Sequence, residues 1–434
     1  MTALTTPVCR QLGIEVPVVQ APIGSAATPE LAAAVAEAGG LGTLALTWVS
    51  APEAVRRIRQ VRRLTSRPFA VNLVLDFPVE ELVEVCLAEG VPVISTFWGD
   101  PSAVSARVRP AGAVHLHTVG SVAEAERAVA AGVDVIVAQG CEAGGHVRGE
   151  VSTMALVPAV VDAVHPVPVI AAGGIADGRG LAAVLALGAQ AGWLGTRFLT
   201  ACEAATHEVY RQAVIGAAPQ DAVHTWCFDG GWPDAPHRAL RNSTLSAWEA
   251  AGRPTAPDRP GEGAVVARSA DGRTWARYQD MVPVPGMSGD LEALALYAGQ
   301  SAGLVHDIAP AGRIVADIAP VPLPSWDGLR HPETRPRHAS PGDGAVAGGA
   351  RHACQGCMGG VRRSVRAVRE PGIRRAAGAS AGSRITVPTS RAKRRWVPSQ
   401  VRVLPRSCRS AHRSWRRIAP KIATAHSKMA VISA

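Results

Sequence analysis

Lysine is nearly absent from this sequence, and its distribution divides the chain into two parts. All three lysines, Lys393, Lys421 and Lys428, lie near the end of the 434 residues. Residues 1–320 contain 22 arginines, no lysine and 31 acidic residues, a net charge of −9, whereas residues 321–434 contain 23 basic and 4 acidic residues, a net charge of +19. The overall net charge of +10 therefore combines an acidic body with a basic tail.

Other scarcities exclude whole classes of protein. No stretch of about 18 uncharged apolar residues occurs, so a membrane-spanning helix is not expected. Residues 1–17 lack the basic-then-apolar pattern of a secretory signal, and the 8 cysteines are scattered rather than spaced as a disulfide framework. These features predict a cytoplasmic protein. With 47% hydrophobic residues, the chain can nevertheless bury a sizeable core.

The body repeats one pattern, a short apolar run followed by an alanine-rich helical stretch. Near-continuous apolar runs are typical of strands buried on both faces of a parallel sheet. Eight such runs occur, at 17–21, 41–46, 69–75, 91–97, 113–119, 133–139, 168–173 and 191–199. Eight strand–helix units predict a TIM (β/α)₈ barrel. An open doubly wound sheet is the alternative, but the first turn, residues 21–25, lacks the G-x-G-x-x-G pattern of that fold.

The pattern changes after the eighth run. Residues 204–216 predict a helix, residues 220–285 mix Trp, Pro and Gly with weak periodicity, and helices are expected again over 290–305 and 310–318. We therefore divide the chain into a barrel, an inserted lid region, C-terminal helices that pack on the barrel, and a disordered basic tail, at 1–203, 204–288, 289–318 and 319–434.

The basic tail differs from the body in composition and in hydrophobic periodicity. It loses apolar periodicity and gains Arg, Ser, Pro and Gly, as a frame-shifted GC-rich coding sequence would, although a genuine basic tail is the alternative. Its Cys354-x-x-Cys357 pair has no second pair at zinc spacing, so no metal site is predicted. Its arginine clusters could contact phosphate backbones, but no nucleic-acid-binding fold accompanies them, so we expect no specific nucleic-acid partner. We predict that the tail contributes nothing to catalysis.

Glycines mark the loops that follow the seventh and eighth strands, where TIM barrels commonly hold a phosphate. The first loop contains Gly173 and Gly174, and the second contains Leu194, Gly195 and Thr196. Backbone amides of such glycines approach phosphate oxygens closely, and a threonine hydroxyl adds a donor. Tight-turn glycines without a ligand are the alternative, but two such loops in one barrel favour a bound phosphate.

The loop after the sixth strand carries the best candidate for catalysis. Gln139 ends the strand, Gly144 and Gly145 permit close backbone approach, and His146 follows over the barrel mouth, where an imidazole could accept a proton near neutral pH. The alternative is a solvated loop histidine. Asn72 interrupts an apolar strand and must find a partner, either in the core or on a cofactor ring.

Six segments together resemble the nitronate monooxygenase family, formerly called 2-nitropropane dioxygenase. They read PVVQAPIG, TPELAAAVAEAGGLG, FAVNL, QGCEAGGHVRGE, PVIAAGGIADGRG and LGTRF, at 17–24, 28–42, 69–73, 139–150, 168–180 and 194–198. A further segment, GDLEALALYAGQSAGL at 289–304, is similar to the C-terminal helix of this family. The resemblance covers residues 1–318 and implies an FMN-bearing TIM barrel. The family is also similar to flavin-dependent enoyl-acyl-carrier-protein reductases and to some NADH:quinone reductases.

The resemblance also implies site residues and an activity. His146 would be the catalytic histidine, and the segment 21–23 (Ala21, Pro22 and Ile23) would lie beside the isoalloxazine ring. FMN would be bound by Asn72, Gln139, Gly144, Gly174, Trp193, Leu194, Gly195 and Thr196. The implied reaction is oxidation of alkyl nitronates, such as propionate 3-nitronate, by O₂, and the alternative is an NAD(P)H-dependent flavin reductase. A nucleic-acid-binding protein is a third hypothesis, and the oligomeric state stays open.

This sequence departs from the family pattern at three places. Ile23 stands where the family usually has Met, and Trp193 and Leu194 stand where it usually has Gln-Met. The backbone amides at these positions can still serve a cofactor. Many members carry a lysine near the fifth strand, which this body lacks, and His117 is a candidate to replace it. His115 shares its face of the strand, which favours ordinary packing for at least one of the two histidines.

Overall fold

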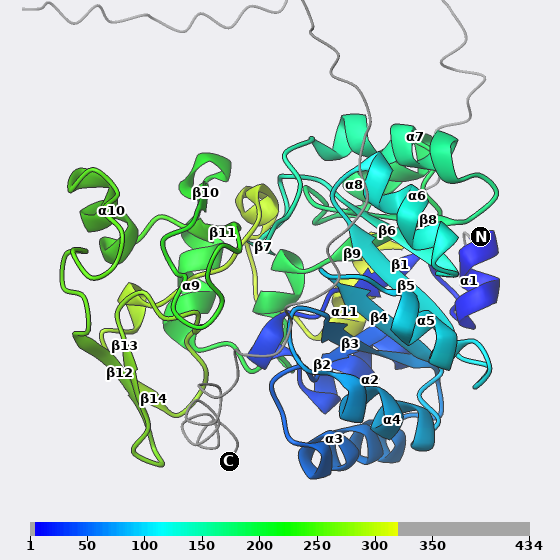
Figure 1. Ribbon diagram of the computed structural model, residues 1–434, viewed down its shortest axis with the longest axis horizontal. Coiled ribbons are helices and arrows are strands. Elements are labelled where there is room, and N and C mark those ends of the chain that lie inside the picture. Colours follow the sequence, from blue (N-terminus) through cyan, green and yellow to red (C-terminus); the bar gives the residue numbers. More distant parts are fainter. Residues whose placement is uncertain (1–4, 320–434) are drawn as a thin grey trace, which may run out of the picture. The chain divides into compact units, whose positions relative to one another are not determined.

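The computed structural model describes residues 5–319, and Figure 1 shows a barrel of parallel strands surrounded by helices. The predicted disordered tail, with its cysteine pair and arginine clusters, lies outside the described residues. The barrel strands are β1 (Val18–Gln20), β2 (Gly42–Ala45), β3 (Phe69–Val74), β4 (Val93–Phe97), β5 (Val114–Val119), β6 (Val135–Gln139), β8 (Val169–Ala172) and β9 (Ala191–Leu194). Each lies within one of the eight predicted apolar runs.

The eight strands form one parallel sheet that closes on itself. Their order is β1-β9-β8-β6-β5-β4-β3-β2, and β1 meets the β2 side through a parallel bridge between Val19 and Leu41. One alternate set of residues, including Val19, Leu116 and Ile170, packs into a single cluster inside the barrel. Val8 and Leu12 of α1 (Pro7–Leu12) join this cluster. The prediction of a TIM barrel is confirmed.

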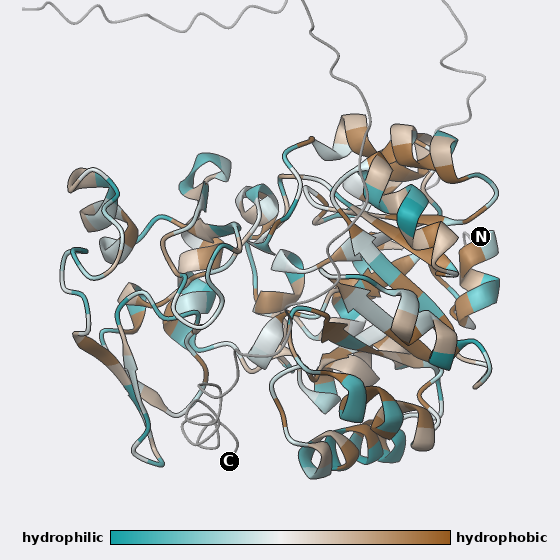
Figure 2. Ribbon diagram, viewed as in Figure 1, coloured by the Kyte–Doolittle hydropathy of each residue, from teal (hydrophilic) through white to brown (hydrophobic). Residues whose placement is uncertain are grey.

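Helices connect the strands of the barrel. They are α2 (Pro29–Glu37), α3 (Ala51–Leu64), α4 (Glu80–Ala88), α5 (Ser102–Val108), α6 (Val122–Ala130), α7 (Thr153–Val164) and α8 (Gly178–Ala186), with short 3₁₀ turns η1 (Gly24–Ala26) and η2 (Thr196–Thr200). The Thr28 hydroxyl accepts from the Leu31 amide at 2.9 Å, and Ser121 and Asp177 cap α6 and α8 in the same way. Figure 2 shows hydrophilic and hydrophobic residues side by side on α3, as a helix between core and solvent requires.

A second structured region follows the barrel. It contains α9 (Glu208–Gly216), η3 (Pro219–Asp221), β10 (Ala222–Thr225), β11 (His237–Leu240), α10 (Ser243–Ala250), β12 (Val265–Ser269), β13 (Thr274–Ala276) and β14 (Met287–Gly289). Its strands form two antiparallel three-stranded sheets, β10-β11-β7 and β13-β12-β14. The strand β7 is only Gly145–His146, which belongs to the loop after β6. Residues 220–285, where the periodicity is weakest, are therefore joined to the barrel at His146, the predicted catalytic histidine.

The helix predicted over 290–305 is wrong. Two short 3₁₀ segments, η4 (Leu291–Ala293) and η5 (Gln300–Leu304), stand in its place, joined by extended residues. Tertiary partners occupy the backbone groups that a helix would use: the Asn242 amide donates to the carbonyl oxygens of Glu292 and Leu294, each at 2.8 Å. The later helix does form, as α11 (Ala311–Ile318). Within residues 5–319 no helix has the length and hydrophobicity to cross a membrane.

Candidate active site

Two amide side chains belong to barrel strands: Asn72 lies within β3, two residues before its end, and Gln139 ends β6. Asn72 is 4% exposed, and its Nδ2 donates to the Ser95 hydroxyl at 3.3 Å. The amide of Asn72 therefore has a hydrogen-bond partner inside the barrel. The Nε2 of Gln139 donates to the backbone carbonyl of His146 at 3.2 Å. The Oε1 of Gln139 is buried and has no hydrogen-bond partner within residues 5–319. A buried acceptor of this kind costs free energy unless a ligand completes it.

His146 lies beside Gln139 and carries a second unpartnered atom. Its Nε2 is buried without a hydrogen-bond partner in the part of the chain that the structure describes. Burial lowers the pKa of His146 from 6.5 to about 3, so the ring is neutral at neutral pH. A neutral imidazole can accept a proton or donate a hydrogen bond, which are the two roles open to a catalytic base. The alternative of a solvated loop histidine is wrong, because only 10% of this side chain is exposed.

A carboxyl group from the second region faces this histidine. The Oδ2 of Asp280 lies 3.8 Å from the Nε2 of His146, and the Tyr297 hydroxyl donates to the Oδ1 of Asp280 at 2.7 Å. Burial raises the pKa of Asp280, so burial disfavours the charged form of both the carboxyl group and the imidazole. Neither residue was predicted from the sequence: Asp280 lies in a segment without periodic pattern or motif, and Tyr297 lies in the 289–304 segment, which was predicted only as a helix.

The loops after β1, β8 and β9 meet at the same end of the barrel. A Cβ on Gly195 would lie 3.5 Å from the Cβ of Ala21 and 3.6 Å from Cγ2 of Ile23, so these loops are in contact. Gly173 and Gly174 have φ of +100° and +74°, which other residues rarely adopt. Trp193 is 7% exposed and lies in the barrel-interior cluster. The structure therefore brings the loop after β9 against residues expected beside a flavin ring, whereas the Gly173 loop lies against the loop after β6, since a Cβ on Gly173 would lie 3.0 Å from the Gly140 carbonyl oxygen.

A segment that the sequence analysis assigned to a helix also enters the site. The Thr196 hydroxyl accepts from the Gly299 amide at 2.9 Å. Gly144 approaches the same segment, because a Cβ there would lie 2.3 Å from the Gly299 nitrogen and 2.4 Å from the Ala298 carbonyl carbon. Gly144 is therefore required for close backbone packing, whereas Gly145 has φ of +72° and nothing within 4 Å of its Cβ position. Of these two glycines, Gly145 is the one that leaves space for a ligand.

His115 and His117 lie on the opposite face of β5 from Leu116, which packs inside the barrel. Both rings lie 2.8 Å from the Thr96 hydroxyl, through Nε2 of His115 and Nδ1 of His117. Burial lowers the pKa of His115 to about 3 and that of His117 to about 4. His117 is therefore held by Thr96 in a buried position, and its role in place of the missing lysine stays a prediction.

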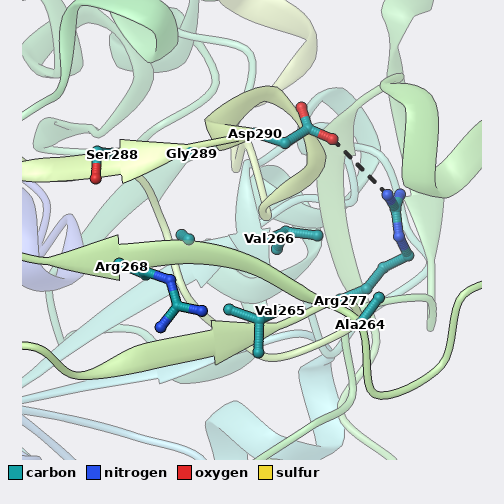
Figure 3. A pocket seen from close by; sticks show the side chains of 9 residues that line it. Ala264, Val265, Val266, Arg268, Arg277, Ser288, Gly289 and Asp290 are labelled. Carbon is teal, nitrogen blue, oxygen red and sulfur yellow. Dashed lines mark ion pairs between the residues drawn. The ribbon is translucent and has the colours of Figure 1, made fainter.

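Two cavities lie outside this cluster. One, of about 480 Å³, runs along the outer side of the barrel mouth between Trp98, His117 and Arg148. The other, of about 300 Å³, lies on the sheet of β12, β13 and β14, where Arg277 is turned toward Asp290 at 3.7 Å (Figure 3). The second cavity contains no residue from a barrel strand and none of the site residues. Among residues 5–319, no group of three His, Cys, Asp or Glu side chains could hold a metal ion.

Comparison with known proteins decides the family. A family model described as nitronate monooxygenase matches residues 6–82 and 77–320. The chain belongs to the nitronate monooxygenase family. Members of this family are flavin-dependent oxidoreductases, so the protein is an enzyme of that class. The recognition made from the sequence motifs is confirmed.

Individual relatives in this family carry different names. The chain is 34% identical over 342 residues to a (3aS,4S,5R,7aS)-5-hydroxy-7a-methyl-1-oxo-octahydro-1H-indene-4-carboxyl-CoA dehydrogenase of Mycobacterium tuberculosis, which covers 73% of this chain and 95% of that protein. It is 33% identical over 356 residues to a nitronate monooxygenase of Paraburkholderia phytofirmans, covering 71% of this chain and 92% of that protein.

The chain also matches solved structures of two differently named enzymes. FabK from Thermotoga maritima matches with a TM-score of 0.60 and 34% identity, covering 72% of this chain and 94% of FabK. A nitroalkane oxidase from Streptomyces ansochromogenes matches with a TM-score of 0.58 and 32% identity, covering 71% of this chain and 96% of that protein. The family is therefore established, and the substrate has to be argued from the site.

Proposed function

We propose that this enzyme uses FMN to oxidise alkyl nitronates, such as propionate 3-nitronate, with O₂. The observation that carries the proposal is the neutral, buried His146, whose Nε2 lacks a partner among the described residues at the mouth of the barrel. A neutral imidazole next to a flavin suits a substrate that reacts as a carbanion-like anion, because the imidazole can take up a proton without first losing one. The enzyme would act on small molecules in the cytoplasm, without a specific nucleic-acid partner.

The residues at the barrel mouth fit FMN. The unpartnered Oε1 of Gln139 can accept from a flavin ring nitrogen, and the loops of Gly173, Gly174, Gly195 and Thr196 can bind the phosphate through backbone amides. The remaining proposed contacts are Asn72, Gly144, Gly145, Trp193, Leu194 and the segment Ala21, Pro22 and Ile23. When bound, FMN supplies the electron-accepting ring and its reoxidation by O₂.

The protein's own groups would bind and orient the nitronate. His146 accepts the α-proton when the substrate enters as the neutral nitroalkane, and donates a hydrogen bond to a nitronate oxygen when it enters as the anion. Asp280 lies 3.8 Å from Nε2 and stabilises the positive charge that the ring acquires on proton uptake. Trp232, whose ring centroid is 4.1 Å from that of His146, excludes water from one side of the imidazole.

An anaerobic experiment tests this function. The purified, FMN-loaded enzyme is mixed with propionate 3-nitronate without O₂, and the flavin absorbance is followed. Bleaching by the nitronate, and recovery of the absorbance on admitting O₂, is the expected result. His146→Ala should slow the bleaching while the flavin stays bound. A protein that remains colourless after FMN loading would contradict the proposal, and loss of flavin from His146→Ala would make that residue structural.

A second candidate function is reduction or dehydrogenation of an acyl thioester with a nicotinamide cofactor. It is favoured by one observation: a relative 34% identical to this chain is named as a carboxyl-CoA dehydrogenase, and a FabK structure matches with 34% identity. The same anaerobic assay separates the two, because NADH or NADPH would bleach the flavin only under the second candidate. Bleaching by a nicotinamide cofactor and not by nitronate would replace the first proposal with the second.

A further inference from the structure

Four aromatic side chains gather at the barrel mouth from four different segments, and we call them the aromatic cluster. They are Trp48 after β2, Phe77 after β3, Trp98 after β4 and Trp232 between β10 and β11. The ring centroid of Trp232 lies 5.0 Å from that of Trp98, 5.3 Å from that of Phe77 and 6.2 Å from that of Trp48. The cluster is therefore one continuous surface centred on Trp232.

The aromatic cluster starts at the proposed catalytic histidine and ends in solvent. The ring of His146 lies 4.1 Å from that of Trp232 and 6.3 Å from that of Trp98. At the other end, Trp48 is 48% exposed, whereas Trp232 is 5% exposed. The rings therefore pack in series from His146 to the exposed Trp48, and exposed apolar surface next to a candidate site marks a binding site.

Trp98 shows that the arrangement is maintained at a cost. Its φ is +63°, in the left-handed region that bulky residues rarely adopt. The guanidinium of Arg148 lies 5.4 Å from the centroid of the Trp98 ring and is held by Glu124 at 2.6 Å, so the ring is supported on one side. The indole Nε1 of Trp232 donates to Asp76 at 3.2 Å, which fixes the orientation of the central ring of the cluster. Strained residues supported in this way are typical of functional sites.

We infer that the aromatic cluster binds an extended apolar group on the substrate, such as a ring or a chain of several carbons next to the reacting carbon. The inference rests on the proposed function for the position of the reacting carbon at His146. A three-carbon carboxylate would leave the outer rings in contact with water, whereas an apolar substituent would cover them. The substrate class is therefore a nitronate, or another carbon acid, with a bulky apolar substituent.

Carboxylates test this inference because they match the charge and shape of a nitronate and do not react. Dissociation constants are measured by isothermal titration calorimetry on the full chain, for straight-chain carboxylates from acetate to octanoate and for 3-phenylpropionate. Each added methylene should tighten binding roughly fourfold, the ratio expected for burying one CH₂. Affinity that does not change along the series would overturn the inference.

A pair of tryptophan variants locates the effect. Trp48→Ala should weaken binding of octanoate by roughly fivefold, because it removes part of the apolar contact area, and should leave acetate unchanged. Trp226→Ala is the matched control, since Trp226 is 50% exposed and its ring contacts that of His224, at 5.1 Å, outside the aromatic cluster. Equal weakening in both variants would overturn the inference. Thermal unfolding midpoints confirm that both variants are folded.

The calorimetry keeps this inference separate from the proposed function. No turnover is required, so the chain-length dependence can be present even when propionate 3-nitronate fails to bleach the flavin. That result would reject the nitronate reaction and retain the apolar binding surface. The reverse result, bleaching by nitronate with no dependence on substituent size, would retain the reaction and reject the surface.

Discussion

Asp280→Asn is the substitution that most directly tests how His146 works. The side chain keeps its size, and Asn can still accept from the Tyr297 hydroxyl that now donates to the Oδ1 of Asp280 at 2.7 Å. It loses the negative charge 3.8 Å from Nε2 of His146. Two unit charges at about this distance interact by about 4 kcal/mol at an effective dielectric constant of about 20. Burial raises the pKa of Asp280 and so lowers the fraction of the carboxyl group that is charged. We therefore expect about half of that interaction energy in the transition state.

A loss of about 2 kcal/mol corresponds to a roughly 30-fold lower kcat. KM should change little, because the charge forms on His146 only during proton transfer. The assay is steady-state oxidation of a neutral nitroalkane, from which His146 takes the α-proton, with the anaerobic bleaching rate as a second measurement. Asp271→Asn is the matched control, since Asp271 is an exposed acid at the turn between β12 and β13, bonded to Ser269 and Arg273. Equal kcat in wild type and Asp280→Asn would refute a role for this carboxylate.

Three further outcomes are expected. Because burial lowers the pKa of His146 to about 3, the imidazole stays neutral as the pH falls. A plot of kcat/KM against pH should therefore show no ionisation near 6.5 between pH 5 and 8. A step near 6.5 would assign His146 a normal pKa. His115 has a pKa of about 3 in the fold, so the unfolded chain binds the extra proton below about 6.5, and the stability that this group contributes above that pH should fall by about 2 kcal/mol at pH 5. Burial lowers the pKa values of His117, His146 and His237 as well, so the total loss measured by urea unfolding at pH 7 and 5 should exceed that amount. Gly144→Ala should lower both flavin content and the unfolding midpoint, because the added Cβ would clash with the backbone of Ala298 and Gly299. Gly216→Ala is the control and should leave both unchanged, since nothing lies within 4 Å of its Cβ position. Intact flavin binding in Gly144→Ala would show that the 298–299 segment can move.

The barrel was predictable because its determinants are local. Each strand is a short apolar run, and several helix starts carry their own caps, as Thr28 and Asp177 do for α2 and α8. Parallel strands place their carboxyl ends together, so the sequence pattern alone was enough to assign Gln139 and the glycines after β8 to one edge of the sheet. Motif order added the family, which composition and periodicity alone would not have supplied.

The partners of His146 were not predictable, and the reason is physical. Asp280 and Trp232 reach the histidine through the pairing of β7 with β11, a contact between segments about ninety residues apart that leaves no periodic pattern in the sequence. The failed helix over 290–305 has a similar cause. Its backbone carbonyls are bound by side chains of α10 and its cap, such as Thr244, which donates to Ala293 at 2.7 Å, and these long-range bonds override local helix propensity.

The pairing of β7 with β11 has a consequence for the order in which this protein folds. His146 becomes a strand residue only when His237 is in register beside it, and that partner lies in the region made after the barrel is complete. Ribosomal synthesis therefore delivers all eight barrel strands before the histidine can be fixed in place. A nascent chain released short of β11 would contain the whole barrel and still lack a formed site. Catalytic competence is thus acquired last, and it reports on completion of the second region rather than of the barrel.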